Sequence, residues 1–386
     1  MSGEGAAVSP RRSVDGSGAG GRRGNLPAVQ VMRLIAASMV VVYHAEVQVR
    51  RLSPDATLDL GIGAAGVDLF FVISGFIMVY VTSMKPQSGS EFLLNRLARI
   101  APLYWLYMTA MVAGLAIAPA LFKSSAFDPP HLVLSYLFVP FPHPVLGIER
   151  PFLPLGWTLN YEMFFYAVFA ALMWMPLGRR VTAMAGGFAM LAAIGWMFPG
   201  LPSPVSFYAS GMLLEFVFGM VIGIAFVRHV PSSLAAIAGA MVVASALVAV
   251  GVLSGVSEGP ERVIYWGIPA AVVIATVLHL EREGLWPRMP VVELLGDASY
   301  SIYLSHIFVL PVAAGLLTRF GVLDLLGATA LRAMLLVIAV AAGTLAYLVI
   351  ERPVIRSSTR LLKSVQGPRR GTAGTPERML RPATRA

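Results

Sequence analysis

The chain has 386 residues, of which 57% are apolar and 13% charged, with no cysteine and a formal net charge of +9. With a mean hydropathy of +0.75, this composition predicts an all-α polytopic membrane protein and excludes a soluble fold. The lack of cysteine excludes disulfides, thiolate metal sites and a cysteine acyl-enzyme.

Ten apolar stretches are long enough, or nearly long enough, to cross a bilayer core of about 30 Å as helices. In chain order they lie near residues 28–48, 64–84, 101–121, 157–176, 181–198, 209–228, 233–254, 263–280, 299–318 and 328–350. The stretch at 181–198 is short and the one at 263–280 contains Pro269, so these two are the weakest. We therefore expect a transmembrane helical bundle of about ten spans.

The basic residues are spread unevenly over the segments between the spans. If the N-terminus is cytoplasmic, most of the 29 Lys and Arg residues fall on the cytoplasmic side, as the positive-inside rule requires. An even number of spans then leaves both termini in the cytoplasm. Residues 1–27 and 357–386 are expected to be disordered basic tails around a membrane domain of residues 28–356. Membrane lipids are expected partners, and nucleic acid is not, because orientation explains the positive charge.

The first apolar stretch contains two ionisable residues. Arg33 and His44 are eleven residues apart, which places them on one side of a helix, about 16 Å apart along its axis. Ionisable groups at such depth usually line a cavity, pair with each other or carry function. Further along, the segment 122–156 is rich in proline and aromatic residues, which is typical of a structured lid or a re-entrant piece.

The assumed orientation sorts the polar residues into two layers. The layer near the outer surface holds His44, Asp68, Asn160, Glu162 and Arg332, beneath Trp157, and the layer near the inner surface holds Arg33, Arg96, Arg99, Tyr300, Tyr303, His306, Glu351 and Arg352. Arginine clusters favour phosphates through charge-assisted, often bidentate hydrogen bonds. The two layers suit a long anionic donor whose phosphates stay at the inner face while its reactive end reaches the outer layer.

Six ordered segments resemble the membrane-bound acyltransferase-3 family. They are RLIAASMVVVYH from Arg33, GVDLFFVISGF from Gly66, FLLNRLARIAPLYWL from Phe92, GWTLNYEMFFY from Gly156, GDASYSIYLSH from Gly296, and Glu351-Arg352-Pro353. The resemblance covers about residues 28–356. Because no hydrolase-like domain follows the last span, the chain is most similar to the exopolysaccharide O-acetyltransferase branch.

The resemblance implies a function and a location. It implies an O-acetyltransferase of the bacterial inner membrane that moves an acyl group, usually acetyl from acetyl-CoA, to a hydroxyl of a polysaccharide or lipid-linked glycan. The family's residues match Arg33 and His44, Arg96 and Arg99, Glu162, and the run from Ser299 to His306. Many relatives have Ser-Val where this chain has Asn160-Tyr161, so the acceptor pocket is expected to differ from theirs.

The chemistry agrees with this match. Acyl transfer to a hydroxyl needs a base that works near neutral pH, and histidine is the usual one. We assign this role to His44, with Asp68 or Glu162 holding its tautomer; a covalent acyl-histidine is the competing scheme. We assign donor binding to Arg33, Arg96, Arg99, Tyr300, Tyr303 and His306, and acceptor binding to Trp157, Asn160 and Arg332. No metal is expected, because the histidines lack ligand spacing.

Other functions remain open. A macrolide or other secondary metabolite is an alternative acceptor, since members of the same family acylate such molecules. A transporter for a lipid-linked sugar would also use a polar cavity with a basic mouth, and an assembly protein for polysaccharide export would need neither layer. The acyl group, the acceptor hydroxyl, an association with polysaccharide assembly machinery and the oligomeric state are not determined by the sequence.

Overall fold

The computed structural model describes residues 26–56, 58, 60–121, 126–256 and 259–366. Within these ranges every regular element is a helix, and the one β-type contact is an isolated bridge between Pro142 and Glu149. Residues 1–25 and 367–386, most of the two predicted tails, lie outside the described residues. The described part of the second tail, residues 357–366, continues the helix that begins at Arg352.

The helices follow one another in this order: α1 (Pro27–Leu52), η1 (Pro54–Ala56), η2 (Gly61–Ala65), α2 (Gly66–Met84), α3 (Gly89–Ile117), η3 (Pro119–Leu121), α4 (Pro129–Tyr136), α5 (Gly156–Ala171), α6 (Leu177–Met197), α7 (Val205–Tyr208), α8 (Leu213–Val227), α9 (Leu234–Leu253), η4 (Val263–Gly267), α10 (Ile268–Arg282), α11 (Pro290–Asp297), α12 (Ser299–Arg319), α13 (Val322–Ala346), η5 (Tyr347–Glu351) and α14 (Arg352–Gln366). The elements η4 and η5 are π-helical and continue directly into α10 and α14. The other η elements are short 3-10 helices.

Among the described residues, eight helical segments are long and apolar enough to cross a membrane. They match eight of the ten predicted spans, including the two with the weakest sequence signal, which form helices of 21 and 20 residues. The remaining two predicted spans correspond to α5, with 16 residues, and α8, with 15. At 1.5 Å per residue these two helices reach only about 24 Å, which is less than the thickness of a bilayer core.

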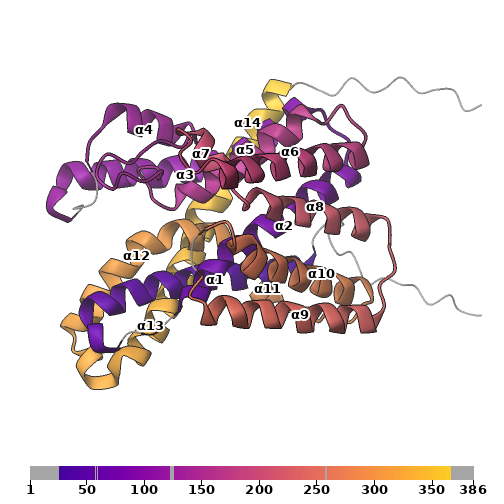
Figure 1. Ribbon diagram of the computed structural model, residues 1–386. Coiled ribbons are helices and arrows are strands. Elements are labelled where there is room, and N and C mark those ends of the chain that lie inside the picture. The colour runs from indigo at the N-terminus through magenta and orange to yellow at the C-terminus, as the bar shows by residue number, and fades with distance from the viewer. Residues whose placement is uncertain (1–25, 57, 59, 122–125, 257–258, 367–386) are drawn as a thin grey trace, which may run out of the picture.

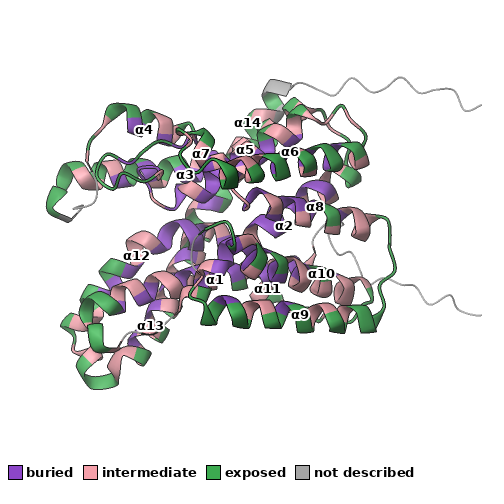
Figure 2. Ribbon diagram, viewed as in Figure 1, coloured by how far each residue is buried: buried purple, intermediate pink, exposed green. Residues whose placement is uncertain are grey.

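The helices lie in two layers (Figure 1). One layer holds α3, α5 and α6, and the other holds α1, α9, α10, α12 and α13, with α2 and α8 between them. Helix α1 packs against α2, α10, α11, α12 and α13, so it occupies the centre of its layer. Burial follows this arrangement (Figure 2). Of an apolar 18-residue stretch within Gly61–Met84, the segment that contains α2, 78% is buried, against 11% of the corresponding stretch of α9. Most residues of α2, and about half of those of α1, therefore face other helices.

Helices α2 and α8 make the most extensive contact between any two described helices. Glycines allow their backbones to approach closely. A Cβ atom built on Gly75 would lie 2.0 Å from the carbonyl oxygen of Phe216, and one on Gly219 would lie 2.0 Å from that of Val72. No larger residue fits either position without a shift of backbone.

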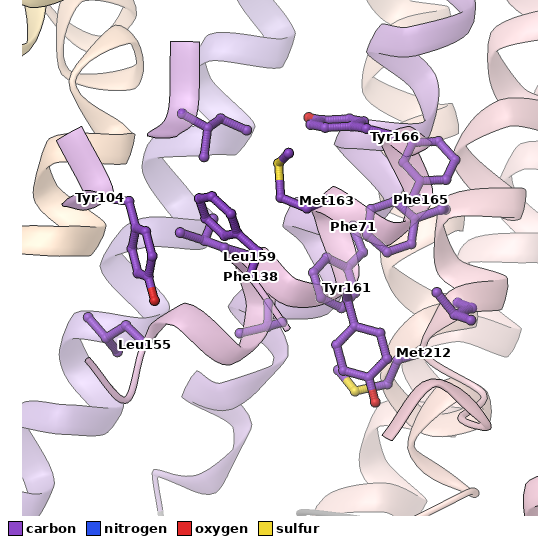
Figure 3. Close-up of a cluster of buried hydrophobic side chains, with 14 of the residues drawn as sticks. Phe71, Tyr104, Phe138, Leu155, Leu159, Tyr161, Met163, Phe165, Tyr166 and Met212 are labelled. Atoms are coloured by element: carbon purple, nitrogen blue, oxygen red, sulfur yellow. The ribbon is translucent and has the colours of Figure 1, made fainter. Parts of the chain in front are cut away.

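An aromatic cluster fixes α5 against this pair. The ring of Phe216 stacks on Phe71 and on Phe165, with 4.5 Å between ring centroids in both cases. Tyr161 stacks on Phe207 at 4.3 Å and donates a hydrogen bond to its carbonyl oxygen. Figure 3 shows Phe71, Tyr161 and Phe165 gathered in this cluster. This packing fixes the position of α5 relative to α2, and so the relative positions of the polar side chains that the two helices carry.

Candidate active site

Two cavities lie along α1. The arginine cavity, of about 330 Å³, is lined by Arg33, Arg96, Arg99, Glu162, Tyr300 and other residues. The histidine cavity, of about 940 Å³, is lined by His44, Trp157 and residues of α6, α7 and the segment 147–150. Two residues, Val67 and Tyr303, line both cavities. The cavities are therefore adjacent, with the side chains of these two residues between them.

The arginines of the first cavity come from two helices. Arg33 lies on α1, and Arg96 and Arg99 lie three residues apart, nearly one turn, on α3. Arg96 and Arg99 both precede the predicted span 101–121, but in the structure they lie within α3, which begins at Gly89. Ser88 and Glu91 form a capping box at that end, which stabilises the earlier start. Both arginines therefore project from a regular helix.

The arginine cavity has an excess of positive charge. None of its three arginines makes an ion pair within 4 Å among the described residues. Arg33 donates a hydrogen bond to the side chain of Gln30 (3.2 Å), and the Nε atom of Arg96 is buried without a hydrogen-bond partner. Glu162 is the only acidic residue in the cavity's lining. Such a set of guanidinium groups suits an anion with several oxygens.

Glu162 lies with the arginines, whereas we had expected it in the layer of His44. Its carboxylate accepts hydrogen bonds from Tyr166 (2.5 Å) and Ser74 (3.1 Å). The reason is the course of α5, which runs from Trp157 in the histidine cavity to Glu162 in the arginine cavity within five residues. Glu162 does not pair with Arg332, although the two were expected in the same layer.

His44 faces the second cavity with a defined tautomer. Its Nδ1–H donates to the carbonyl oxygen of Val40 (3.0 Å), so the other ring nitrogen, Nε2, is left to accept a proton. The ring of His306 lies 4.9 Å from that of His44, centroid to centroid. His306 likewise bonds a backbone carbonyl, that of Ile302, and its Nε2 is buried without a partner.

The predicted depth of His306 is therefore wrong. We placed it near the inner surface because we counted depth from the start of the apolar stretch at 299. In the structure α11 precedes α12 with only Ala298 between them, and a Cβ on Gly296 would lie 2.0 Å from the carbonyl oxygen of Gln30. Gly296 thus sits beside the first turn of α1, so that residues further along α12 reach the level of His44.

The predicted contact between His44 and a carboxylate is also absent. Within the described residues no ion pair or hydrogen bond joins His44 to an acid. Asp68 is fully buried and accepts instead from Arg262 (2.5 Å), with Glu215 beside it. The tautomer of His44 is held by the carbonyl of Val40 because this oxygen lies one turn before it on the same helix.

Two of the residues predicted to bind the acceptor, Arg332 and Asn160, lie outside the linings of both cavities. Arg332 pairs with Glu46 (2.6 Å) and donates to the carbonyl of Ala56, so it ties α13 to α1, and it lines neither cavity. Asn160 is fully buried, its amide has no hydrogen-bond partner, and it also lines neither cavity. Both residues had been expected to bind the acceptor.

The two tyrosines of α12 line the arginine cavity but use their hydroxyls on protein groups. Tyr300 donates to the carbonyl of Ile100 (2.9 Å), which joins α12 to α3. Tyr303 bonds the hydroxyl of Thr158 (2.9 Å) and donates to the carbonyl of Leu155 (3.2 Å), which joins α12 to α5.

Sequence reasoning missed several residues of the histidine cavity and its wall. Arg262 was not among the predicted site residues, and Glu149 and Arg150 fell within the segment 122–156 that was expected to be a lid or a re-entrant piece. All three line the histidine cavity. Glu215 is fully buried behind Arg262. Its signal was present, because a lone acid within an apolar run such as 213–227 is itself unusual. Among the described residues, no group of three or more His, Cys, Asp or Glu is arranged to hold a metal ion.

The chain is similar to known proteins along most of its length. Residues 26–350 match the family model described as an acyltransferase domain. The exopolysaccharide production protein ExoZ of Rhizobium meliloti is 39% identical over 300 residues, which are 76% of this chain and 90% of ExoZ. The acyltransferase MdmB of Streptomyces mycarofaciens is 28% identical over 367 residues, 86% of this chain and 92% of MdmB. No solved structure matches the chain.

The family match covers most of the chain, and both relatives are covered over nearly their whole length. The matched region contains both cavities and all eight helical segments able to cross a membrane except the end of the last one. The chain therefore belongs to the acyltransferase-3 family and is a multi-pass membrane acyltransferase.

Proposed function

We propose that the protein transfers a short acyl group, in the first place acetyl, from acyl-CoA to a hydroxyl of a cell-surface or lipid-linked polysaccharide in the bacterial inner membrane. The observation that carries this proposal is the pair of adjacent cavities. One cavity is cationic, the other contains a histidine with a free acceptor nitrogen, and Val67 and Tyr303 border both. A family relative named for exopolysaccharide production supports the choice of acceptor.

The arginine cavity fits the phosphates of an acyl-CoA. Arg33, Arg96 and Arg99 make no ion pairs among the described residues, and one buried guanidinium nitrogen of Arg96 has no partner. Anionic oxygens would satisfy these groups. When bound, acyl-CoA supplies an activated acyl group as a thioester. The cavity would hold its anionic end, about 16 Å along α1 from His44.

His44 is suited to act as the general base. Its Nε2 takes the proton of the acceptor hydroxyl as the oxygen attacks the acyl carbon. The carbonyl of Val40 keeps Nδ1 protonated, so the resulting imidazolium has a hydrogen-bond acceptor on its other side. The same proton then passes to the sulfur as the carbon–sulfur bond breaks, which gives an ester and a free thiol and returns His44 to its neutral form.

The histidine cavity is suited to a sugar. At about 940 Å³ it is large enough for an oligosaccharide end, and it combines aromatic side chains, including Trp157 and Trp196, with the polar groups Glu149 and Arg150. Flat apolar faces of sugars pack on such rings, and hydroxyls need hydrogen-bond partners around them.

Replacement of His44 tests this proposal. We expect a strain that lacks the native gene and expresses the His44→Ala variant to carry at least about 100-fold less ester on its surface glycan. The reason is that a general base accelerates such a reaction about 10²–10⁴-fold. The glycan itself should persist. Mass spectrometry of the surface polysaccharide measures both quantities. The matched control is His229→Ala, which removes an exposed histidine in the segment after α8 and should leave the ester content unchanged.

Two results would count against the proposal. Loss of the polysaccharide itself would favour transport or assembly over acyl transfer. An unchanged ester content in the His44→Ala variant, with normal amounts of protein in the membrane, would remove His44 from the chemistry.

A further inference from the structure

The border between the two cavities consists of few side chains. Val67 lies in the first turn of α2 and Tyr303 in the second turn of α12, and both face the arginine cavity on one side and the histidine cavity on the other. Both are buried, with 6% of their surface exposed. Any group that extends from one cavity into the other must pass these two residues.

Tyr303 is held firmly at this border. Its hydroxyl is bonded to Thr158 and to the carbonyl of Leu155, and its ring lies 5.9 Å from the ring of Phe70. Because contacts from α2 and from the start of α5 restrain this side chain, the space at the border depends mainly on the other residue there, Val67.

The proposed base lies beside the same border. The ring of His306 is 4.9 Å from that of His44 and 5.9 Å from that of Tyr303, centroid to centroid. His44 and Tyr303 also line the histidine cavity together. A thioester that reaches His44 from the arginine cavity must therefore place its acyl group close to Tyr303.

We propose that Val67 and Tyr303 form the acyl-group subsite and limit the enzyme to short acyl chains. This inference rests on the proposed function. The donor's acyl group lies between the two side chains with its carbonyl carbon toward His44, and each added methylene must fit against Val67. In a closely fitting pocket one extra methylene changes kcat/KM by about 10–200-fold. Val67 and Tyr303 are thus specificity residues and not proton-transfer groups.

The experiment compares acyl donors of increasing length. Membranes that contain the full-length protein are supplied with acetyl-CoA, propionyl-CoA or butyryl-CoA, and with surface polysaccharide of the deletion strain, stripped of esters by mild base, as acceptor. Mass spectrometry measures the ester formed from each donor. Removal of two methyl groups in Val67→Ala should raise the ratio of butyryl to acetyl transfer at least about ten-fold over the wild type.

Two further variants complete the design. Val29→Ala makes the same change in a residue that lines only the arginine cavity, and it should leave the ratio unchanged. Val67→Ile narrows the passage and should lower the ratio of propionyl to acetyl transfer, which gives a result of opposite sign even if the smaller variant fails to fold.

The outcomes separate this inference from the function on which it rests. If the wild type forms acetyl ester but the Val67 and Val29 variants have equal donor ratios, the acyl-group subsite is overturned and the proposed function stands. If the wild type forms no ester from any of the three donors, both are overturned.

Discussion

At the scale of single residues, the site is defined by groups that lack the usual partners. The three arginines have one carboxylate, Glu162, in the cavity's lining, and this carboxylate is already bonded to Ser74 and Tyr166. Half-buried cations without ion pairs are costly in a membrane protein. Their retention in one cavity is explained if an anionic substrate completes the site.

Arg33 and Arg99 provide the test of this explanation. We expect Arg33→Ala and Arg99→Ala each to raise the KM for acetyl-CoA about ten-fold, with kcat changed much less, because contacts to remote phosphates act equally in the ground and transition states. Arg99→Lys should have a smaller effect, since lysine keeps the charge but not the fork of donors. The control is Arg179→Ala, in an exposed residue of α6. Steady-state kinetics that show a fall in kcat at constant KM would contradict donor binding by these arginines.

At the scale of helices, the sequence was a good guide to where helices form and a poor guide to depth. A helix lies at each of the ten predicted stretches, because long apolar runs can satisfy their backbone in lipid in no other way. Depth was counted from the ends of these runs. That count failed for His306, because α11 adds eight residues before α12, and for Glu162, because α5 runs from one cavity to the other within five residues. Arg96 and Arg99 lie with Arg33 as expected, but on a helix that begins at a polar capping box.

The contacts across the site were not predictable for a related reason. The sequence indicated that Arg33 and His44 share a helix face, and the structure places them in the two adjacent cavities. It could not indicate that Asp68 pairs with Arg262, because these residues come from helices far apart in the chain. Such pairings depend on helix packing, which apolar patterns do not specify.

The packing of α2 on α8 gives a prediction at this scale. A Cβ on Gly219 would lie 2.0 Å from the carbonyl oxygen of Val72, so Gly219→Ala must push the two helices apart. We expect a loss of about 1–3 kcal/mol in stability, measured as a lower Tm in detergent. A Cβ on Gly239 of α9 would meet no neighbouring atom within 4 Å, so Gly239→Ala should leave Tm unchanged or slightly higher, because alanine favours helices. Equal changes in Tm for the two variants would contradict the close contact.

At the scale of the whole molecule, two cavities with different chemistry lie next to one another in the helical bundle. Helix α1 runs along both cavities, with Arg33 in one and His44 in the other. Among the described residues, eight helical segments around these cavities are long and apolar enough to cross a membrane. Under the proposed function, this arrangement would let a donor from one side of the membrane react with an acceptor on the other.

The most direct test of this account is the accessibility of the two cavities from each side of the membrane. The chain has no cysteine, so Val81→Cys in the arginine cavity and Ser210→Cys in the histidine cavity can be labelled singly with a membrane-impermeant maleimide. We predict that the Val81 variant reacts only in inverted vesicles and is protected by acetyl-CoA, whereas the Ser210 variant reacts only in intact spheroplasts. Reaction of both variants from the same side, or no protection by acetyl-CoA, would contradict a route across the membrane.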